Sequence, residues 1–201
     1  MNEQGRDHAL HEAVAAEPRR YTYVELLAEL PEANRPAELW DGELIGSPAP
    51  SLQHQKVALT FYRRLHDWVS AANLGEVFAA PVDMVLSSHC VMQPDVAFVA
   101  RDRLDLDRRA IEGPADLIAE IVSLGGRDRD RIRKRDLYEQ HGVKEYWIID
   151  PQPGTIEVLF LESTGYRRIG CFRAGDTARS QLLTGFTVPV DQIFNGIRGA
   201  V

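Results

Sequence analysis

The stretch LIAEIVSLGGRDRDRIRKRDLYEQHGVKEYWIID, residues 117–150, decides the expected fold. It begins with a short apolar run, continues through a charged segment, and ends in an aromatic-rich run followed by Pro151. These patterns predict a buried strand over 117–122, a polar helix from about 128 to 141 that stops at Gly142, and a strand over 143–150. A connection of this length joins parallel strands by a right-handed crossover, so the stretch predicts the centre of an α/β or α+β sheet.

Further elements are expected on both sides of that unit. A short helix begins at the capping-box pair Thr22 and Glu25, and a long helix over 52–72 is capped by Ser51. Apolar side chains at spacings of three and four predict the core-facing side of the long helix: Val57, Phe61, Leu65, Trp68 and Ala72. Strands are expected over 37–45 (a strand–turn–strand), 82–86, 93–100 (joined to the preceding strand by a turn at 87–89), 156–161, 166–172 and 187–190. The predicted architecture is a mixed central β-sheet flanked by helices, with a C-terminal strand meander.

Length and composition limit the class of protein. The 201 residues are 44% hydrophobic and 26% charged, a balance typical of one folded domain rather than a disordered chain. We expect residues 1–20 to be a polar lead-in and residues 21–201 to form the single domain. No apolar run approaches the roughly 20 residues that span a bilayer, and no signal-peptide core is present, so we expect a cytoplasmic protein without a membrane partner. The two cysteines form no CxxC pattern, which argues against a structural zinc site.

Charge is unevenly distributed along the chain. The net charge of −7 by itself argues against a nucleic-acid-binding protein. Residues 127–135 (RDRDRIRKR), however, hold six cations and two acids, a local charge of +4. This segment is interpreted as a solvated mixed-charge helix or as an element that contacts phosphate groups, and both interpretations stay open. The 23 cationic residues comprise 20 arginines and only three lysines, one of which, Lys134, lies in this segment.

Two acids stand on apolar strands. Asp95 lies in QPDVAFVA and Glu120 in DLIAEIVS. Carboxylates are costly to bury there unless they are paired or bind a cation, and two of them together favour a divalent metal. The simpler alternative is that each accepts a hydrogen bond from a neighbouring backbone group or arginine. Fourteen residues after Glu120 comes Lys134, on one helix face with Asp130 and Tyr138, where it would pair with Asp130 or point back to Glu120.

Together these motifs resemble a known family. The runs QPDVAFV, GPADLIAEIVS and KRDLYEQHGVKEYWIIDP, with RYTYVELLAELPE and AELWDGELIGSPAPSLQHQ before them and DTARSQLLTGFTV after them, are similar to the Uma-type family of restriction-endonuclease-like proteins. That family belongs to the PD-(D/E)xK nuclease superfamily. The resemblance spans about residues 20–195 and implies a restriction-endonuclease-like core. It also implies a Mg²⁺-dependent endodeoxyribonuclease, a hydrolase whose substrate is DNA.

The resemblance assigns roles to individual positions. Asp95 and Glu120 match the two acids and, with the main-chain carbonyl of Ile121, would hold Mg²⁺ or Mn²⁺. Val122 stands where the superfamily usually has a lysine, and Lys134 replaces it from the next helix. The candidate catalytic residues are Asp95, Glu120, Lys134, His54 and Glu38, and the candidate substrate-binding residues are Arg131, Arg135, Tyr138 and Asp83.

The implied reaction is hydrolysis of a phosphodiester by a metal-activated water. Lys134 would orient that water or offset charge on the phosphate, and Glu38 would be a further ligand or would orient Lys134. His54 would accept a proton, although a hydrogen-bonded core histidine is an equally open interpretation. The loop that follows Glu120 reads Ser123-Leu124-Gly125-Gly126 where the family usually has Ser-Pro-Ser-Thr.

Other functions and assemblies stay open at this point. The chain would also suit a catalytically inactive nuclease-fold module that binds nucleic acid or a protein partner. A metal-dependent phosphoesterase for substrates smaller than DNA is a third interpretation. A homodimer is expected if both DNA strands are cut, because a double-strand cut needs two sites or two visits.

Overall fold

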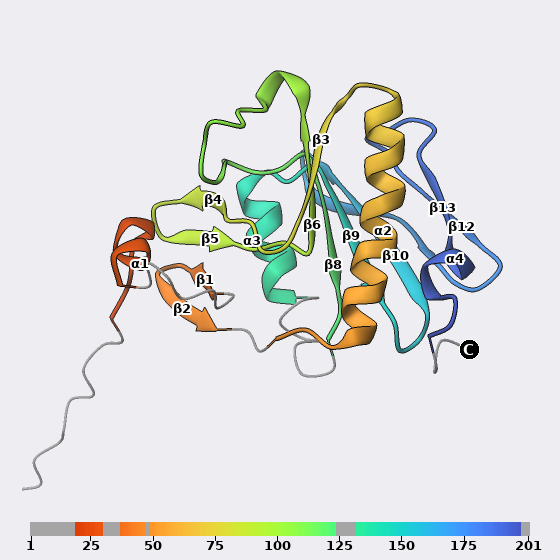
Figure 1. The fold of residues 1–201 in the computed structure, drawn as a ribbon, viewed down its shortest axis with the longest axis horizontal. Coiled ribbons are helices and arrows are strands. Elements are labelled where there is room, and N and C mark those ends of the chain that lie inside the picture. The colour runs from red at the N-terminus through yellow and green to blue at the C-terminus, as the bar shows by residue number, and fades with distance from the viewer. Residues whose placement is uncertain (1–18, 30–36, 47–48, 124–131, 198–201) are drawn as a thin grey trace, which may run out of the picture.

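The computed structural model of the chain describes residues 19–29, 37–46, 49–123 and 132–197. Its central sheet is formed by six strands: β3 (Gly75–Ala79), β6 (Val96–Ala100), β8 (Leu117–Ile121), β9 (Glu145–Asp150), β10 (Thr155–Glu162) and β11 (Gly165–Phe172). Their order is β11-β10-β9-β8-β6-β3, and β8 and β9 are parallel while the other neighbours are antiparallel (Figure 1). The predicted mixed sheet is therefore confirmed, although the strand β3 was not anticipated.

The strand–helix–strand unit has the predicted form. Strands β8 and β9 run parallel in register from Leu117 opposite Glu145 to Ile121 opposite Ile149. Between them lies α3 (Lys134–His141), which ends at Gly142 with φ of +85°, a left-handed conformation that favours glycine. The predicted start of this helix, residues 128–131, lies outside the described part of the chain.

One face of the central sheet is covered by α2 (Leu52–Ala71) and by the C-terminal elements β12 (Thr177–Arg179), β13 (Thr187–Pro189) and α4 (Val190–Phe194) (Figure 1). The Ser51 hydroxyl caps α2 by accepting the His54 N–H at 3.2 Å. The buried side of the helix is formed by Val57, Phe61, Leu65 and Val69. Trp68 lies at the margin against Phe186, and Ala72, just past the last turn, is exposed, so the predicted stripe is wrong at its end.

The opposite face is covered by α3 and by a second sheet. This sheet has the order β2-β1-β5-β4-β7, with β1 (Ala37–Trp40), β2 (Glu43–Gly46), β4 (Met84–Ser87), β5 (Cys90–Met92) and β7 (Ile111–Glu112). The turn at 87–89 therefore joins β4 to the short β5, and the prediction that this turn joins 82–86 directly to a strand over 93–100 is wrong. Pro94 has no N–H to donate to a ladder, so the chain leaves the second sheet there and enters the central one as β6.

The remaining elements are short. Helix α1 (Tyr23–Glu29) begins with the predicted capping box, in which the Thr22 N–H donates to Glu25 Oε2 at 2.8 Å and the Glu25 N–H donates to Thr22 Oγ1 at 3.3 Å. A 3₁₀ turn, η1 (Arg101–Arg103), follows β6. Across the described ranges, none of the helices has the length and apolar character that crossing a membrane requires.

Candidate active site

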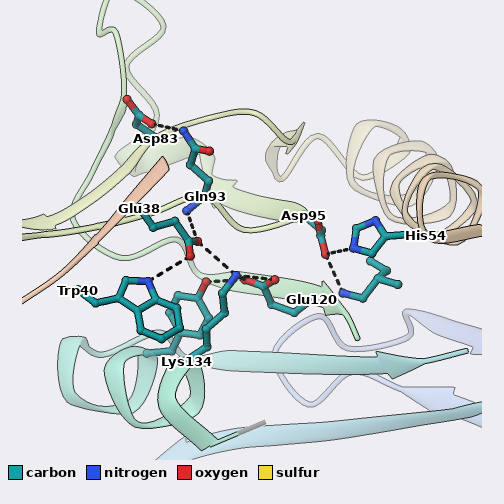
Figure 2. Close-up of polar contacts among 10 residues, drawn as sticks. Glu38, Trp40, His54, Asp83, Gln93, Asp95, Glu120 and Lys134 are labelled. Carbon is teal, nitrogen blue, oxygen red and sulfur yellow. Dashed lines mark hydrogen bonds and ion pairs between the residues drawn. The ribbon is translucent and has the colours of Figure 1, made fainter. Parts of the chain in front are cut away.

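The two acids singled out by the sequence come from neighbouring strands. Strands β6 and β8 are antiparallel, with Val96 opposite Ala119. Asp95, the residue before β6, is thus brought beside Glu120, near the end of β8. The close-up in Figure 2 shows their carboxylates at this edge of the sheet, each among its own polar partners.

Glu120 is buried and fully engaged. Lys134 Nζ, from the first turn of α3, lies 2.9 and 3.0 Å from the two carboxylate oxygens, and the Tyr138 hydroxyl donates to Oε1 at 2.6 Å. Glu120 is 3% exposed and Lys134 is 7% exposed. Burial, reinforced by the charge of Glu120, raises the pKa of Tyr138 well above its ordinary value, so the phenol keeps its proton and donates a hydrogen bond to Glu120. Lys134 therefore points back to Glu120, one of the two predicted alternatives.

A second buried carboxylate, Glu38 of β1, lies on the other side of the Lys134 ammonium. Its Oε1 is 3.2 Å from Lys134 Nζ and accepts the Gln93 main-chain N–H at 2.9 Å. Its Oε2 accepts the Trp40 indole N–H at 3.1 Å. Because both oxygens are engaged and the side chain is buried, Glu38 has a fixed orientation toward the amine (Figure 2).

Asp95 turns toward α2 instead. Its Oδ2 accepts the Ile121 N–H at 2.8 Å and lies 3.2 Å from His54 Nε2. The Asp95 and His54 side chains are 17% and 15% exposed, so this pair reaches solvent while Glu120 does not. The hydrogen bond from the Ile121 N–H is of the kind expected if Asp95 simply accepts from a neighbouring backbone group, the simpler alternative of the sequence analysis. It also fixes the Asp95 carboxylate against the end of β8.

Asp83 is connected to the site only indirectly within the described residues. It accepts the Gln93 side-chain amide at 2.7 Å and the Tyr23 hydroxyl at 3.0 Å, and Gln93 in turn donates its main-chain N–H to Glu38. Burial, together with the charge of Asp83, raises the pKa of Tyr23 to about 12. Asp83 thus holds Gln93 in place, and its predicted contact with substrate stays a prediction.

The other predicted substrate-binding residues occupy different positions. Tyr138 is fully buried behind Glu120. Arg135 is exposed on α3. Arg131, like Asp130, lies outside the described residues. Their roles toward substrate remain predictions.

Sequence reasoning missed two members of the Glu38 network, Trp40 and Gln93. Side chains two residues apart on a strand lie on the same side, so the position of Trp40 beside Glu38 could have been predicted from residues 37–40. Gln93 acts through its main-chain N–H, which carries no sequence signature.

The oxygen atoms of Asp95, Glu120 and the Ile121 carbonyl are ligands of the kind that a hard divalent cation prefers. Among the described residues no group of three or more His, Cys, Asp or Glu side chains is arranged to hold a metal. The expected set of two carboxylates with one main-chain carbonyl, from Asp95, Glu120 and Ile121, does not require a third such side chain, since water completes the shell. Glu120 would have to share its oxygens between the cation and Lys134.

Comparison with known proteins gives a family and a fold. The family model of Uma2, described as "Putative restriction endonuclease", matches residues 24–191. A crystal structure described as that of a putative nuclease belonging to DUF820 from Anabaena variabilis ATCC 29413 superposes with a TM-score of 0.72 at 17% identity, covering 88% of this chain and 98% of that chain. At this identity the likeness shows the fold. Among curated proteins, none matches the sequence.

Proposed function

Because the chain belongs to the Uma2 family of restriction-endonuclease-like proteins, we propose that it is a metal-dependent endonuclease that hydrolyses phosphodiester bonds of DNA. One observation carries the proposal: the buried Lys134 ammonium lies on Glu120, beside Asp95 on the neighbouring strand. Two acids at the ends of adjacent strands, with a lysine beside them, form the set that the nuclease resemblance implies. The lysine reaches this position from α3, although Val122 occupies its usual place in the sequence.

Asp95, Glu120 and the Ile121 carbonyl would hold Mg²⁺ or Mn²⁺. When bound, such an ion polarises a phosphate and lowers the pKa of a coordinated water. The chain's own groups supply the rest. Lys134 holds Glu120 in place and offers positive charge to the phosphate as negative charge develops there. His54 is the proposed proton acceptor, and the contact of its Nε2 with Asp95 Oδ2 sets the orientation of the imidazole ring.

DNA is the proposed substrate, and a homodimer is the proposed form for a double-strand cut. Sedimentation of the purified chain with and without a short duplex tests the second point. A sedimentation coefficient that corresponds to two chains supports the dimer, and a single-chain value at micromolar concentration contradicts it.

The test of function is nicking of supercoiled plasmid with Mg²⁺, with Mn²⁺ and with a chelator. We expect metal-dependent nicking by the wild type and a loss of roughly 10²-fold or more in Asp95→Asn, because the variant removes a negative charge from the metal site. The matched control is Asp116→Asn, which removes a buried carboxylate at the other end of β8. Nicking at the wild-type rate in Asp95→Asn contradicts the site. DNA binding without nicking by the wild type contradicts catalysis and supports the inactive binding module.

A further inference from the structure

Trp40 links two consecutive residues of the α3 start to the β1–β2 hairpin. Its indole N–H donates to Glu38 at 3.1 Å, and Glu38 contacts Lys134. Its ring lies under the Arg133 guanidinium, which is 4.6 Å from the ring centroid. Trp40 is only 2% exposed, so the indole cannot change orientation without repacking its surroundings.

The Arg133 contacts alone would hold the helix loosely. Arg133 also pairs with Glu43 at 3.4 Å, but both side chains are more than half exposed, and such pairs contribute little. The buried contacts of Trp40 and Glu38 are different, since a low-dielectric setting strengthens hydrogen bonds to a charged group. The orientation of Glu38 therefore has more influence on Lys134 than the exposed Arg133 pair has.

We propose that Trp40 is a positioning residue of the site: its indole N–H fixes the Glu38 carboxylate, and Glu38 in turn holds the Lys134 ammonium on Glu120. Without the indole N–H, the Glu38 carboxylate would rotate about its terminal torsion, whose angle has a broad distribution. It would then draw the Lys134 ammonium away from Glu120. The effect of Trp40 on cleavage rests on the proposed function, whereas its effect on the position of Lys134 does not.

The scarcity of lysine makes the position of Lys134 measurable. The chain has three lysines, so ¹³C labelling at lysine Cε gives three side-chain signals. Lys56 Nζ donates to the Asn195 carbonyl at 2.8 Å, and Lys144 Nζ donates to Asp116 Oδ1 at 2.8 Å. These two signals are internal references, and each is assigned by substituting its lysine.

Trp40→Phe is the test variant, because it keeps an aromatic face under Arg133 and removes the indole N–H together with part of the ring volume, a loss that the control variant shares. Trp147→Phe is the matched control: Trp147 also follows a glutamate by two residues, and its indole N–H donates to buried Glu145 at 2.7 Å. We expect Trp40→Phe to shift the Lys134 signal and leave the other two in place, and Trp147→Phe to leave all three in place. Trp40→Tyr, which also lacks the indole N–H, replaces Trp40→Phe if that variant does not fold.

An unchanged Lys134 signal in Trp40→Phe overturns the proposal, and so does an equal shift in Trp147→Phe. In the nicking assay we expect Trp40→Phe to lower kcat about tenfold with KM unchanged, as for other groups that orient a site residue. The same substitution should have no further effect in a Glu38→Gln background, because Trp40 acts through Glu38. If the losses of kcat in the two single variants add in the double variant, Trp40 does not act through Glu38. A shifted Lys134 signal in a protein that never nicks DNA supports the positioning role and contradicts only the proposed function.

Discussion

The two ends of β8 hold buried carboxylates in opposite charge settings. At its start, Asp116 meets Lys144 at 2.8 Å and Arg103 at 3.1 Å, so one acid faces two cations. At its end, Glu120, Glu38 and Asp95 surround one ammonium and one imidazole. The first arrangement gives one carboxylate two cations, whereas the second gathers three carboxylates at one place. Carboxylates gathered in this way are ligands that a divalent cation takes in proteins, so the end of β8 is the functional candidate.

The largest expected difference is in the stability lost when Lys134 or Lys144, the lysines at the two ends of β8, is replaced. Lys134→Met leaves Glu38 and Glu120 buried without their ammonium, which should cost about 3–5 kcal/mol in the free energy of unfolding. Lys144 is half exposed, and Arg103 still pairs with Asp116 in its absence, so Lys144→Met should cost no more than about 1 kcal/mol. Urea denaturation of both variants gives the comparison. Equal shifts of the two midpoints would show that the ends of β8 do not differ in this way.

A smaller effect is expected when the Tyr138 hydroxyl is removed. Tyr138→Phe loses a hydrogen bond to the charged Glu120, worth about 1.5–3 kcal/mol at neutral pH. Because burial raises the pKa of Tyr138 in the folded chain, its contribution is present below the unfolded value of about 10 and is lost as the pH rises toward the folded value. The variant should therefore show a shallower decline of stability above pH 10, measured by denaturation from pH 7 to 11. A decline as steep as that of the wild type contradicts the assignment.

The dependence of stability on pH below neutrality tests the ion pairs of Asp116 at the start of β8. Burial alone would raise the pKa of Asp116, but hydrogen bonds from Lys144 and the Ala100 N–H, with the charge of Arg103, lower it below its ordinary value. Its stabilisation is thus present above an unfolded pKa of about 3.9 and is lost as the pH falls through the folded pKa. Asp116→Asn should lose less stability than the wild type between pH 5 and pH 2. Thermal unfolding across this range measures it, and parallel profiles for the two proteins contradict it.

Local patterns in the sequence predicted where the helices and strands lie better than they predicted which strands pair. The capping box at Thr22, the crossover from 117 to 150 and the stop at Gly142 all follow from nearby residues. The division into two large sheets does not, because β1 pairs with β5, and β6 with β3 and β8, across long stretches of chain. The short β5 was not predicted, and Pro94 was placed inside a strand over 93–100, for the same reason.

The site was predicted in part. The candidate catalytic residues were named from the sequence, mainly through the family resemblance, and the structure brings them together around the start of β6 and the end of β8 (Figure 2): Asp95, Glu120, Lys134, His54 and Glu38. Their division into a Glu38–Lys134–Glu120 group and a His54–Asp95 group was not predicted. It depends on main-chain donors, the Gln93 N–H and the Ile121 N–H, which every non-proline residue possesses. Only the fold decides which of these donors meet a carboxylate.

Binding of Mn²⁺ to the chain in the absence of DNA tests the central claim most directly. Titration calorimetry on the wild type should show saturable binding, weakened about tenfold or more in Asp95→Asn because one of the two carboxylates is lost. Asp116→Asn, which removes the acid at the start of β8, should bind Mn²⁺ as the wild type does. Equal affinity in all three proteins, or no binding by the wild type at millimolar Mn²⁺, would contradict a metal site at the end of β8.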